Sequence, residues 1–526
     1  MTEFEPARTR RAARVVSAAL ALLVLLWLRL PTNRVDILNV DEADFVVEAS
    51  ALLDGGRPYI DFVEKKPPLI YYLYAGGLAL VGRYNLPAFR LLLVGYVFAS
   101  ALLAAAIARR VYGERAALIA APAYALAVSA GLPMDFHAAN AETLFLLPLL
   151  AGTYFVLPTL AGPEEANGRR AFAAGALIGL ASLIKQQAGM QLPIALAAMA
   201  LAGTGRWKRI ALASTGFASV WALALAGLAA ASALDEFYYW TVDINRYYIA
   251  HGNSLRDGLP LLAAALQTMF GFAPALWALA AARLLHELIA ARVRRSLVLL
   301  WFFGSLVPIA LGGRYFSHYF LQLFPPLVLL ASSAAAAVWE RLDTVPRARS
   351  IAVVAFVALL VVRPAAAGMA PFHDAEALSV PHAMPDARAV ARYVRDHTAP
   401  DARVLFWGYG SALYYLSQRR PATRFPYVTY LVGAVEGTPA WWSPFHSSRP
   451  LEIPRAWDLF FEDLAKHPPA LVVDTSEPGY FAFYKFPPRK YPRLARYLEA
   501  HYRRTEVSGF PVWTRNEEAV LQSPLR

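Results

Sequence analysis

Long apolar runs separated by short polar segments occupy residues 1–366 of this 526-residue chain. A run of about 18 or more apolar residues can cross the roughly 30 Å hydrocarbon core of a bilayer. The pattern therefore predicts an α-helical polytopic membrane protein with about eleven transmembrane helices. The predicted spans lie near residues 12–30, 87–108, 116–133, 142–160, 171–184, 188–203, 210–233, 260–282, 297–311, 319–338 and 350–366.

Two apolar segments differ from an ordinary span. The first run follows a cluster of arginines, as the apolar part of a signal peptide does, but no small-x-small cleavage site comes after it. We therefore predict an uncleaved first span. The segment 69–81 is too short to cross a bilayer, and we expect it to lie in the interface or to re-enter the membrane.

Basic residues orient the chain. Most Lys and Arg residues of the short connecting segments fall on one side if the N-terminus is cytoplasmic, as the positive-inside rule requires. We therefore expect a multi-pass protein of the cell (inner) membrane, with the loop 31–86 and the tail outside the cytoplasm. The net charge of +12 could also indicate a nucleic-acid partner. We reject that partner because the arginines cluster at the ends of apolar runs.

The tail, residues 367–526, differs from the rest in composition, since it is polar, rich in proline and patterned. Helices are predicted at 386–397 and 457–467, and buried strands at 403–408 and 470–475. This alternation predicts a small extracytoplasmic α/β domain. Gly408 and Gly410 follow the first strand, where they favour a tight strand-to-helix turn over a nucleotide-binding loop.

The first outer loop carries an unusual number of carboxylates. They are Asp41, Glu42, Asp44, Glu48 and Asp54. Apolar residues between Phe45 and Leu53 have helical spacing, which predicts an amphipathic surface helix with its carboxylates on the other faces. Asp41 can serve as the N-cap of this helix. It can also serve as a general base for an acceptor group, and the two roles are compatible.

The sequence "EKKPPLIYY" follows that helix. Lys65 and Lys66 precede two prolines, and Tyr71 and Tyr72 come shortly after. Such residues can anchor a protein at the membrane surface, because lysines snorkel to lipid phosphates and tyrosines favour the interface. The alternative is a pocket for the phosphate of one particular lipid, for which a lysine supplies a point charge.

The stretch "VDEADFVVEASALLDGGRPYIDFVEKKPPLIYYLYA" (40–75) resembles the first outer loop of the GT-C glycosyltransferases. The similarity is to the protein O-mannosyltransferases, the lipid A aminoarabinose transferases and their bacterial relatives. It implies a GT-C fold, an acidic catalytic residue at Asp41 and a donor-phosphate contact at Lys66. The aminoarabinose transferases have a metal-site glutamate just before that lysine. Lys65 stands there in this chain, so we assign no cofactor and leave a divalent metal open.

A second polar cluster follows the predicted span 116–133. Asp135, His137, Asn140 and Glu142 fall within a few residues of the next outer turn. Polar groups at the end of a span are often simply solvated. The GT-C resemblance implies an acidic residue at the start of the following span, and Glu142 fits that position best, with Asp135 as the alternative.

Further cations are predicted on the same side as Lys66. Lys185 lies in a tight outer turn, where a charge near membrane depth marks a functional site or snorkels to the interface. In "LGGRYFSHYF" (311–320), a Gly-Gly break precedes Arg314, His318 and Tyr319. An aromatic belt with a snorkelled arginine accounts for this pattern, but we favour a phosphate clamp.

Together these features predict a glycosyltransferase that moves a sugar from a polyprenyl-phosphate donor to an extracytoplasmic glycan, lipid or protein. The predicted catalytic residues are Asp41, Glu42 and Glu142, and the predicted donor-phosphate ligands are Lys66, Arg314, His318 and Lys185. Lys65, Tyr71, Tyr72, His137, Asn140 and Tyr319 are candidate substrate contacts. One direct displacement would invert the anomeric centre. The alternatives are a lipid or solute transporter and a polysaccharide ligase.

Overall fold

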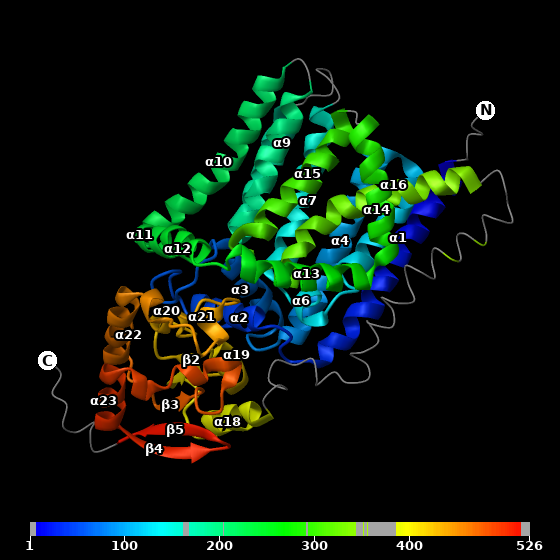
Figure 1. The fold of residues 1–526 in the computed structure, drawn as a ribbon. Coiled ribbons are helices and arrows are strands. Elements are labelled where there is room, and N and C mark those ends of the chain that lie inside the picture. The colour runs from blue at the N-terminus through cyan, green and yellow to red at the C-terminus, as the bar shows by residue number, and fades with distance from the viewer. Residues whose placement is uncertain are drawn as a thin grey trace.

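The computed structural model describes residues 7–160, 168–202, 205–290, 293–342 and 385–516, together with Ile351 and Ala355. A bundle of helices from the N-terminal part of the chain lies against a smaller C-terminal α/β domain (Figure 1). Short helices and loops lie between the two, and this intermediate layer holds the candidate site.

The bundle helices follow the apolar runs of the sequence. The longer ones are α1 (Ala7–Arg29), α4 (Leu86–Tyr112), α7 (Ala141–Thr159), α10 (Arg206–Ala230) and α16 (Phe324–Leu342). The shorter ones are α5 (Glu114–Ala127), α8 (Gly168–Ile184), α9 (Gln191–Ala200) and α15 (Val293–Ala310). Within the described ranges, 5 helical segments are long and apolar enough to cross a bilayer, or 6 with one bent pair. The predicted count of about eleven spans is therefore not confirmed.

The single span predicted at 260–282 is wrong. The chain forms α13 (Leu255–Phe272) and α14 (Pro274–Ala290), which meet at an angle of 102°. The proline at 274 explains the break, since it disfavours the helical conformation in the residue before it. Accordingly, Ala273 has φ −147° and ψ 62°. The span predicted at 350–366 lies outside the described residues apart from Ile351 and Ala355.

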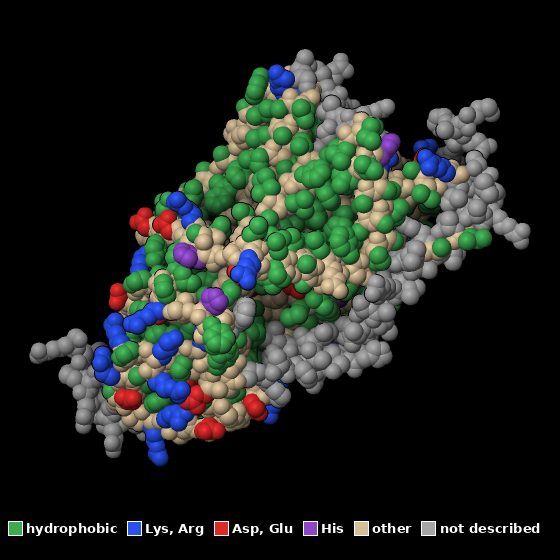
Figure 2. All heavy atoms as spheres, viewed as in Figure 1, with side chains coloured by type: hydrophobic (Ala, Val, Ile, Leu, Met, Phe, Trp, Pro, Cys, Tyr) green, Lys and Arg blue, Asp and Glu red, His purple; other side chains and the backbone are tan. Residues whose placement is uncertain are grey.

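The surface of the bundle is apolar. Hydrophobic side chains cover its visible face, whereas Lys, Arg, Asp and Glu gather over the C-terminal domain (Figure 2). Large hydrophobic residues such as Leu223, Leu285 and Ile289 are exposed on bundle helices. Water would disfavour such a surface and lipid tolerates it. The chain is thus a polytopic α-helical membrane protein, as the sequence predicts.

The intermediate layer consists of short elements. Its helices are α2 (Val40–Leu53), α3 (Leu69–Val81), α6 (Pro133–Phe136), α11 (Leu234–Phe237) and α12 (Ile244–Ala250). Its other turns are η1 (Leu30–Arg34), η2 (Gln186–Met190), η3 (Tyr238–Asp243), η4 (Leu311–Gly313) and η5 (Ser317–Leu323). The helix α3 occupies the short apolar segment of the sequence and lies beside α2 at the base of the bundle (Figure 1).

The N-terminus of α2 corrects one prediction. The N-cap is Asn39, whose side-chain oxygen accepts a 2.9 Å hydrogen bond from the backbone N–H of Asp41. Asp41 is therefore not the cap, and its carboxylate is available for another role. Asp44 and Glu48, predicted on the polar faces of a surface helix, are buried because the C-terminal domain covers α2.

The C-terminal domain is built on a five-stranded sheet of order β2-β1-β3-β5-β4. Its strands are β1 (Arg403–Trp407), β2 (Arg420–Pro421), β3 (Leu471–Asp474), β4 (Tyr502–Val507) and β5 (Phe510–Arg515). Its helices are α18 (Pro385–Asp396), α19 (Ser411–Ser417), α20 (Thr429–Val432), α21 (Pro439–Trp442), α22 (Pro454–Lys466) and α23 (Pro492–His501). Strand β1 pairs in parallel with β2 and β3, and β5 pairs antiparallel with β3 and β4. The α/β prediction is confirmed, and the β4–β5 hairpin is an addition to it.

Candidate active site

A cavity of about 580 Å³ lies between α2, the near ends of the bundle helices and the C-terminal domain. Segments far apart in the sequence form its wall. The predicted site residues that line it are Asp41, Lys65, Lys66, Lys185, Arg314, His318 and Tyr319. A single cavity thus brings together the predicted base and all the predicted phosphate ligands.

The start of α2 fixes the position of Asp41. Next to it, Glu42 is fully buried, and its carboxylate accepts hydrogen bonds from the backbone N–H of Leu38 at 2.5 Å and of Ala139 at 3.3 Å. Arg90 of α4 lies 3.5 Å from the same carboxylate. Glu42 does not line the cavity, so a catalytic role does not fit its placement. It positions the N-terminus of α2.

Asp41 lies in a field of positive charge. Burial opposes ionisation of its carboxyl, but the neighbouring Lys66, His318 and Lys185 outweigh burial and lower its pKa. Asp41 is therefore a carboxylate at neutral pH. An ionised carboxylate at the wall of a cavity can accept a proton from a bound hydroxyl or amine.

Lys66 lies on the same side as Asp41 and has several acidic neighbours. Its Nζ atom is 3.3 Å from Glu64 Oε1 and 4.8 Å from the centre of the Phe45 ring. Burial alone would lower the pKa of Lys66, but Glu64 and Asp41 raise it well above its usual value. The side chain of Lys66 therefore stays protonated, and its ammonium group can bind a phosphate.

Tyrosines hold the segment around Lys66. The hydroxyl groups of Tyr59 and Tyr71 donate hydrogen bonds to the carbonyl oxygen of Lys66, at 2.8 and 3.0 Å. Tyr71 is thus buried behind the lysine rather than facing the cavity. The Tyr427 hydroxyl donates to Glu64, which connects this segment to the C-terminal domain.

The second polar cluster forms the opposite wall. Lys185 makes an ion pair with Glu142, and its Nζ lies 4.6 Å from the centre of the Tyr319 ring. His318 Nδ1 lies 2.8 Å from Asp135 Oδ1. Glu142 itself does not line the cavity, although it holds a lysine that does. Asp135, the alternative acidic candidate, does line the cavity. Each acidic candidate therefore contacts a cation of this wall, Glu142 through Lys185 and Asp135 through His318.

Arg314 and Lys65 meet at the edge of the cavity that faces the C-terminal domain. Arg314 donates to the carbonyl oxygens of Glu436 at 2.8 Å and Tyr248 at 2.9 Å. Lys65 Nζ lies 3.3 Å from a carboxylate oxygen of Glu436 and 4.2 Å from the centre of the Tyr248 ring. The guanidinium of Arg314 also lies 3.5 Å from the centre of the Tyr248 ring. The two cations thus share the Tyr248 ring and contact different groups of Glu436, the carboxylate for Lys65 and the backbone carbonyl for Arg314.

Besides Tyr71, three further candidate substrate contacts lie outside the cavity lining. Tyr72 is 53% exposed and does not line the cavity. His137 is buried against the carbonyl oxygen of Ser129, and burial together with Arg29 lowers its pKa to about 3, so the ring is neutral. Asn140 is buried and donates to the carbonyl oxygen of Asp135 at 2.9 Å. The last two support the wall rather than reach the cavity.

Several lining residues are absent from the sequence prediction. Those from the C-terminal domain are Tyr409, Tyr427, Glu436, Trp441 and Phe481, and those from the intermediate layer include Asn245 and Tyr248. Tyr409 had a sequence signal, because it stands between Gly408 and Gly410 in the predicted turn after β1. Asn245 and Tyr248 lie in the segment 235–258, whose many Tyr and Trp residues are a weaker signal. No group of three or more His, Asp or Glu side chains in the described residues is arranged to hold a metal ion.

A helical membrane bundle, an intermediate layer with a charged cavity and an attached α/β domain define the GT-C fold, the fold of membrane glycosyltransferases that use lipid-linked donors. Residues 65–234 match the family model of the dolichyl-phosphate-mannose-protein mannosyltransferases. No curated protein sequence matches the chain.

Solved structures extend the likeness to nearly the whole chain. ArnT from Cupriavidus metallidurans, bound to undecaprenyl phosphate, has a TM-score of 0.61 and 15% identity over 97% of this chain and 99% of that one. The oligosaccharyltransferase AglB from Archaeoglobus fulgidus, with an inhibitory peptide and a dolichol-phosphate, has a TM-score of 0.59 and 12% identity over 98% of this chain and 75% of that one. The GT-C fold predicted from the sequence is confirmed.

Proposed function

We propose that this protein is a membrane glycosyltransferase that moves a sugar from a polyprenyl-phosphate donor to an extracytoplasmic acceptor. The supporting observation is a single cavity that holds the ionised Asp41 together with Lys66, Lys185 and Arg314. Both similar structures named above contain a polyprenyl phosphate. The family match to mannosyltransferases supports the same reaction class.

The cations of the cavity would bind the phosphate of the donor. Lys66 supplies a buried ammonium, and Lys185 and Arg314 add two further cations from other parts of the lining. The polyprenyl chain would extend into the bilayer between helices, because its apolar surface favours lipid over water. The sugar then lies in the cavity beside Asp41.

The reaction would be one displacement at the anomeric carbon. An acceptor hydroxyl or amine attacks that carbon, and the bond from the anomeric carbon to the phosphate oxygen breaks with its electron pair. The leaving group is the polyprenyl phosphate, whose added charge the cations stabilise. The proton of the acceptor moves to Asp41. Because no covalent enzyme intermediate forms, the configuration inverts.

Donor binding would also prepare the base. Lys66, His318 and Lys185 lower the pKa of Asp41 in the empty cavity. A bound phosphate compensates those positive charges, so the pKa of Asp41 rises towards the value favoured by its burial. The carboxylate is then a stronger base when the donor is in place.

The transporter alternative is less favoured. A transporter needs a route through the membrane and two related conformations, whereas AglB, which has a similar fold, is an oligosaccharyltransferase. We further propose, from the positions of the basic residues, that the N-terminus is cytoplasmic and that the C-terminal domain is extracytoplasmic.

The test uses the full-length protein in detergent and polyprenyl-phosphate donors that carry a hexose or a pentose. Wild type is expected to bind the donor in native mass spectrometry and to transfer its sugar. Lys66→Ala should lose the bound lipid, and Asp41→Asn should keep it while losing transfer by about 100-fold or more. Asp458→Asn, on the exposed surface of α22, is the matched control. Full transfer by Asp41→Asn would exclude the assignment of this residue as the base.

A further inference from the structure

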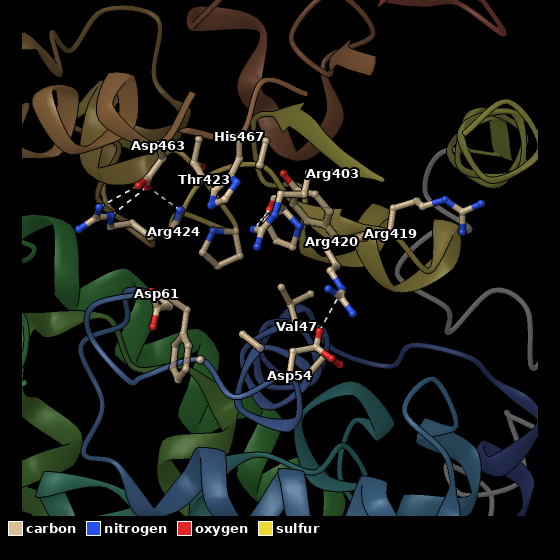
Figure 3. Close-up of a pocket in the computed structure, with 18 of the residues that line it drawn as sticks. Val47, Asp54, Asp61, Arg403, Arg419, Arg420, Thr423, Arg424, Asp463 and His467 are labelled. Atoms are coloured by element: carbon tan, nitrogen blue, oxygen red, sulfur yellow. Dashed lines mark hydrogen bonds and ion pairs between the residues drawn. The ribbon is translucent and has the colours of Figure 1, made fainter. Parts of the chain in front are cut away.

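A second cavity, of about 400 Å³, lies at the other end of α2. The C-terminal turn of α2 and the loop after it form one wall, and residues of the C-terminal domain around β1, β2 and α22 form the other. Figure 3 shows Arg403, Arg420 and His467 on the upper wall, with Asp54 and Asp61 on the lower one. The proposed transfer reaction makes no use of this cavity.

Positive charge exceeds negative charge in the lining. Six lysines and arginines stand against three carboxylates. The basic residues are Arg57, Arg403, Arg419, Arg420, Arg424 and Lys466, and the acidic ones are Asp54, Asp61 and Asp463. A cleft with low-dielectric walls and one excess sign of charge attracts ligands of the other sign.

Several of these cations already have structural partners. Arg424 makes a two-pronged ion pair with Asp463, with contacts of 2.9 and 2.8 Å. Arg419 donates to Thr398 and to backbone carbonyl groups near the end of α18. Figure 3 shows its guanidinium turned away from the cavity. Arg57 pairs with Asp61, and Lys466 pairs with Glu462. These four residues are held by contacts within the protein and are not available to a ligand.

Arg403 and Arg420 remain. Arg403 donates one 3.0 Å hydrogen bond to the carbonyl oxygen of Pro421, and no described carboxylate makes an ion pair with it. Arg420 lies 3.0 Å from Asp54, but Asp54 is shared with Arg83, which lies 2.6 Å away. Burial and the neighbouring Arg420 lower the pKa of Arg403. Two guanidinium groups thus face a cavity with too little negative charge.

Residues of α2 line both cavities. Asp41 and Asp44 line the first cavity, and Val47, Ala51 and Asp54 line the second. Successive positions in this series are three or four residues apart, so each lies close to the next on the helix surface. At 1.5 Å per residue, Asp54 lies about 20 Å along the helix from Asp41. A ligand that reaches from one cavity to the other must be extended.

We propose that the second cavity binds an anionic group, a phosphate or a carboxylate, carried by the acceptor some distance from the hydroxyl or amine that receives the sugar. Arg403 and Arg420 are the ligands of this group, because a guanidinium can donate two parallel hydrogen bonds to either anion. That the anion belongs to an acceptor rests on the proposed transferase function. The presence of an anion site does not depend on that function.

The test is calorimetric titration of the full-length protein in detergent, with inorganic phosphate in one arm and sodium glucuronate in the other. Lys66→Ala serves as the background, because it removes one of the proposed phosphate ligands of the first cavity and so weakens anion binding there. In that background, Arg403→Gln should weaken binding of the anion about 10- to 100-fold. Arg403→Lys should recover part of the loss, and Arg493→Gln, on the exposed face of α23, should have no effect.

The outcomes separate the possibilities. Binding of phosphate alone identifies a phosphate-bearing acceptor, and binding of glucuronate alone identifies an acidic glycan. Binding of neither anion, or binding that survives Arg403→Gln combined with Arg420→Gln, overturns the proposal. If wild type transfers no sugar but this titration succeeds, the transferase function fails while the anion site stands.

Discussion

The hydroxyl of Tyr409 in the C-terminal domain donates a 2.9 Å hydrogen bond to Asp44 Oδ2 on α2. Tyr409 stands in the turn between β1 and α19, and Asp44 is one helical turn after Asp41. The C-terminal domain is therefore a wall of the candidate active site rather than a separate attachment. Its contact reaches the same helix that carries the proposed base.

Asp44 and Asp41 should respond differently to the same substitution. Burial and the nearby Asp41 raise the pKa of Asp44 well above its usual value, which favours the neutral form of its carboxyl. Asp44→Asn replaces one neutral hydrogen-bonding group with another and should retain most of the transfer activity. Asp41→Asn should lose about 100-fold or more. Initial rates with a polyprenyl-phosphate donor provide the measurement, and an equal loss in both variants would contradict the assignment.

The hydrogen bond itself can be tested at Tyr409. Tyr409→Phe leaves the ring in place and removes the hydroxyl that donates to Asp44 Oδ2. A buried polar atom left without its partner costs about 1–3 kcal/mol. Thermal unfolding in detergent should show a lower midpoint than wild type. Combination with Asp44→Leu, which removes the acceptor as well, should add little, and fully additive losses would show that the two residues are uncoupled.

Much of the site could be predicted because the cations that line it lie at the same ends of the predicted spans. Lys66, Lys185 and Arg314 stand next to apolar runs, so an orientation of the helices is enough to bring them to one side. The proline at 274 also signals the bend between α13 and α14. The hydropathy pattern does not show this bend, because residues on both sides of it are apolar.

The burial of α2 could not be predicted from its own sequence. Its polar face is typical of a surface helix, and Glu48 on that face has both carboxylate oxygens buried without a hydrogen-bond partner in the described structure. Residues such as Tyr409, more than 350 positions further along the chain, cover this face. A local pattern reports which side of a helix is polar, but it does not report which distant segment packs there.

The pH dependence of sugar transfer should show how the neighbouring positive charges affect the pKa of Asp41. The base must be ionised, and Lys66 is the largest single influence that lowers its pKa against burial. In wild type, kcat/KM should fall only below the ordinary carboxyl pKa of about 4. In Lys66→Ala the lowering influence is lost while burial remains, so the acid limb should move to higher pH. Lys66→Arg keeps the charge and should leave the limb in place. An acid limb that does not move in Lys66→Ala would show that ionisation of Asp41 does not cause it.

Glu42 should behave as a positioning residue. Glu42→Gln keeps an acceptor for Leu38 N–H but loses the buried ion pair with Arg90. We expect a loss of about 1–3 kcal/mol in the free energy of unfolding and a moderate fall in transfer rate. The pH profile should keep the wild-type acid limb, since Asp41 is intact. Glu499→Gln, on an exposed face of α23, is the matched control; a shifted limb in Glu42→Gln would instead assign Glu42 to proton transfer.

Lys185 and Glu142 form a buried pair, and removal of one partner should be worse than removal of both. Glu142→Leu leaves the ammonium of Lys185 buried without its carboxylate, at a cost of about 3–5 kcal/mol. Glu142→Leu combined with Lys185→Met leaves no unpaired charge and should recover most of that stability. Because Lys185 lines the cavity and Glu142 does not, the double variant should still bind the donor more weakly than wild type. Denaturant unfolding and donor titration, measured side by side, separate the two effects. Recovery of both stability and donor affinity would mean that the pair is purely structural and that Lys185 is not a phosphate ligand.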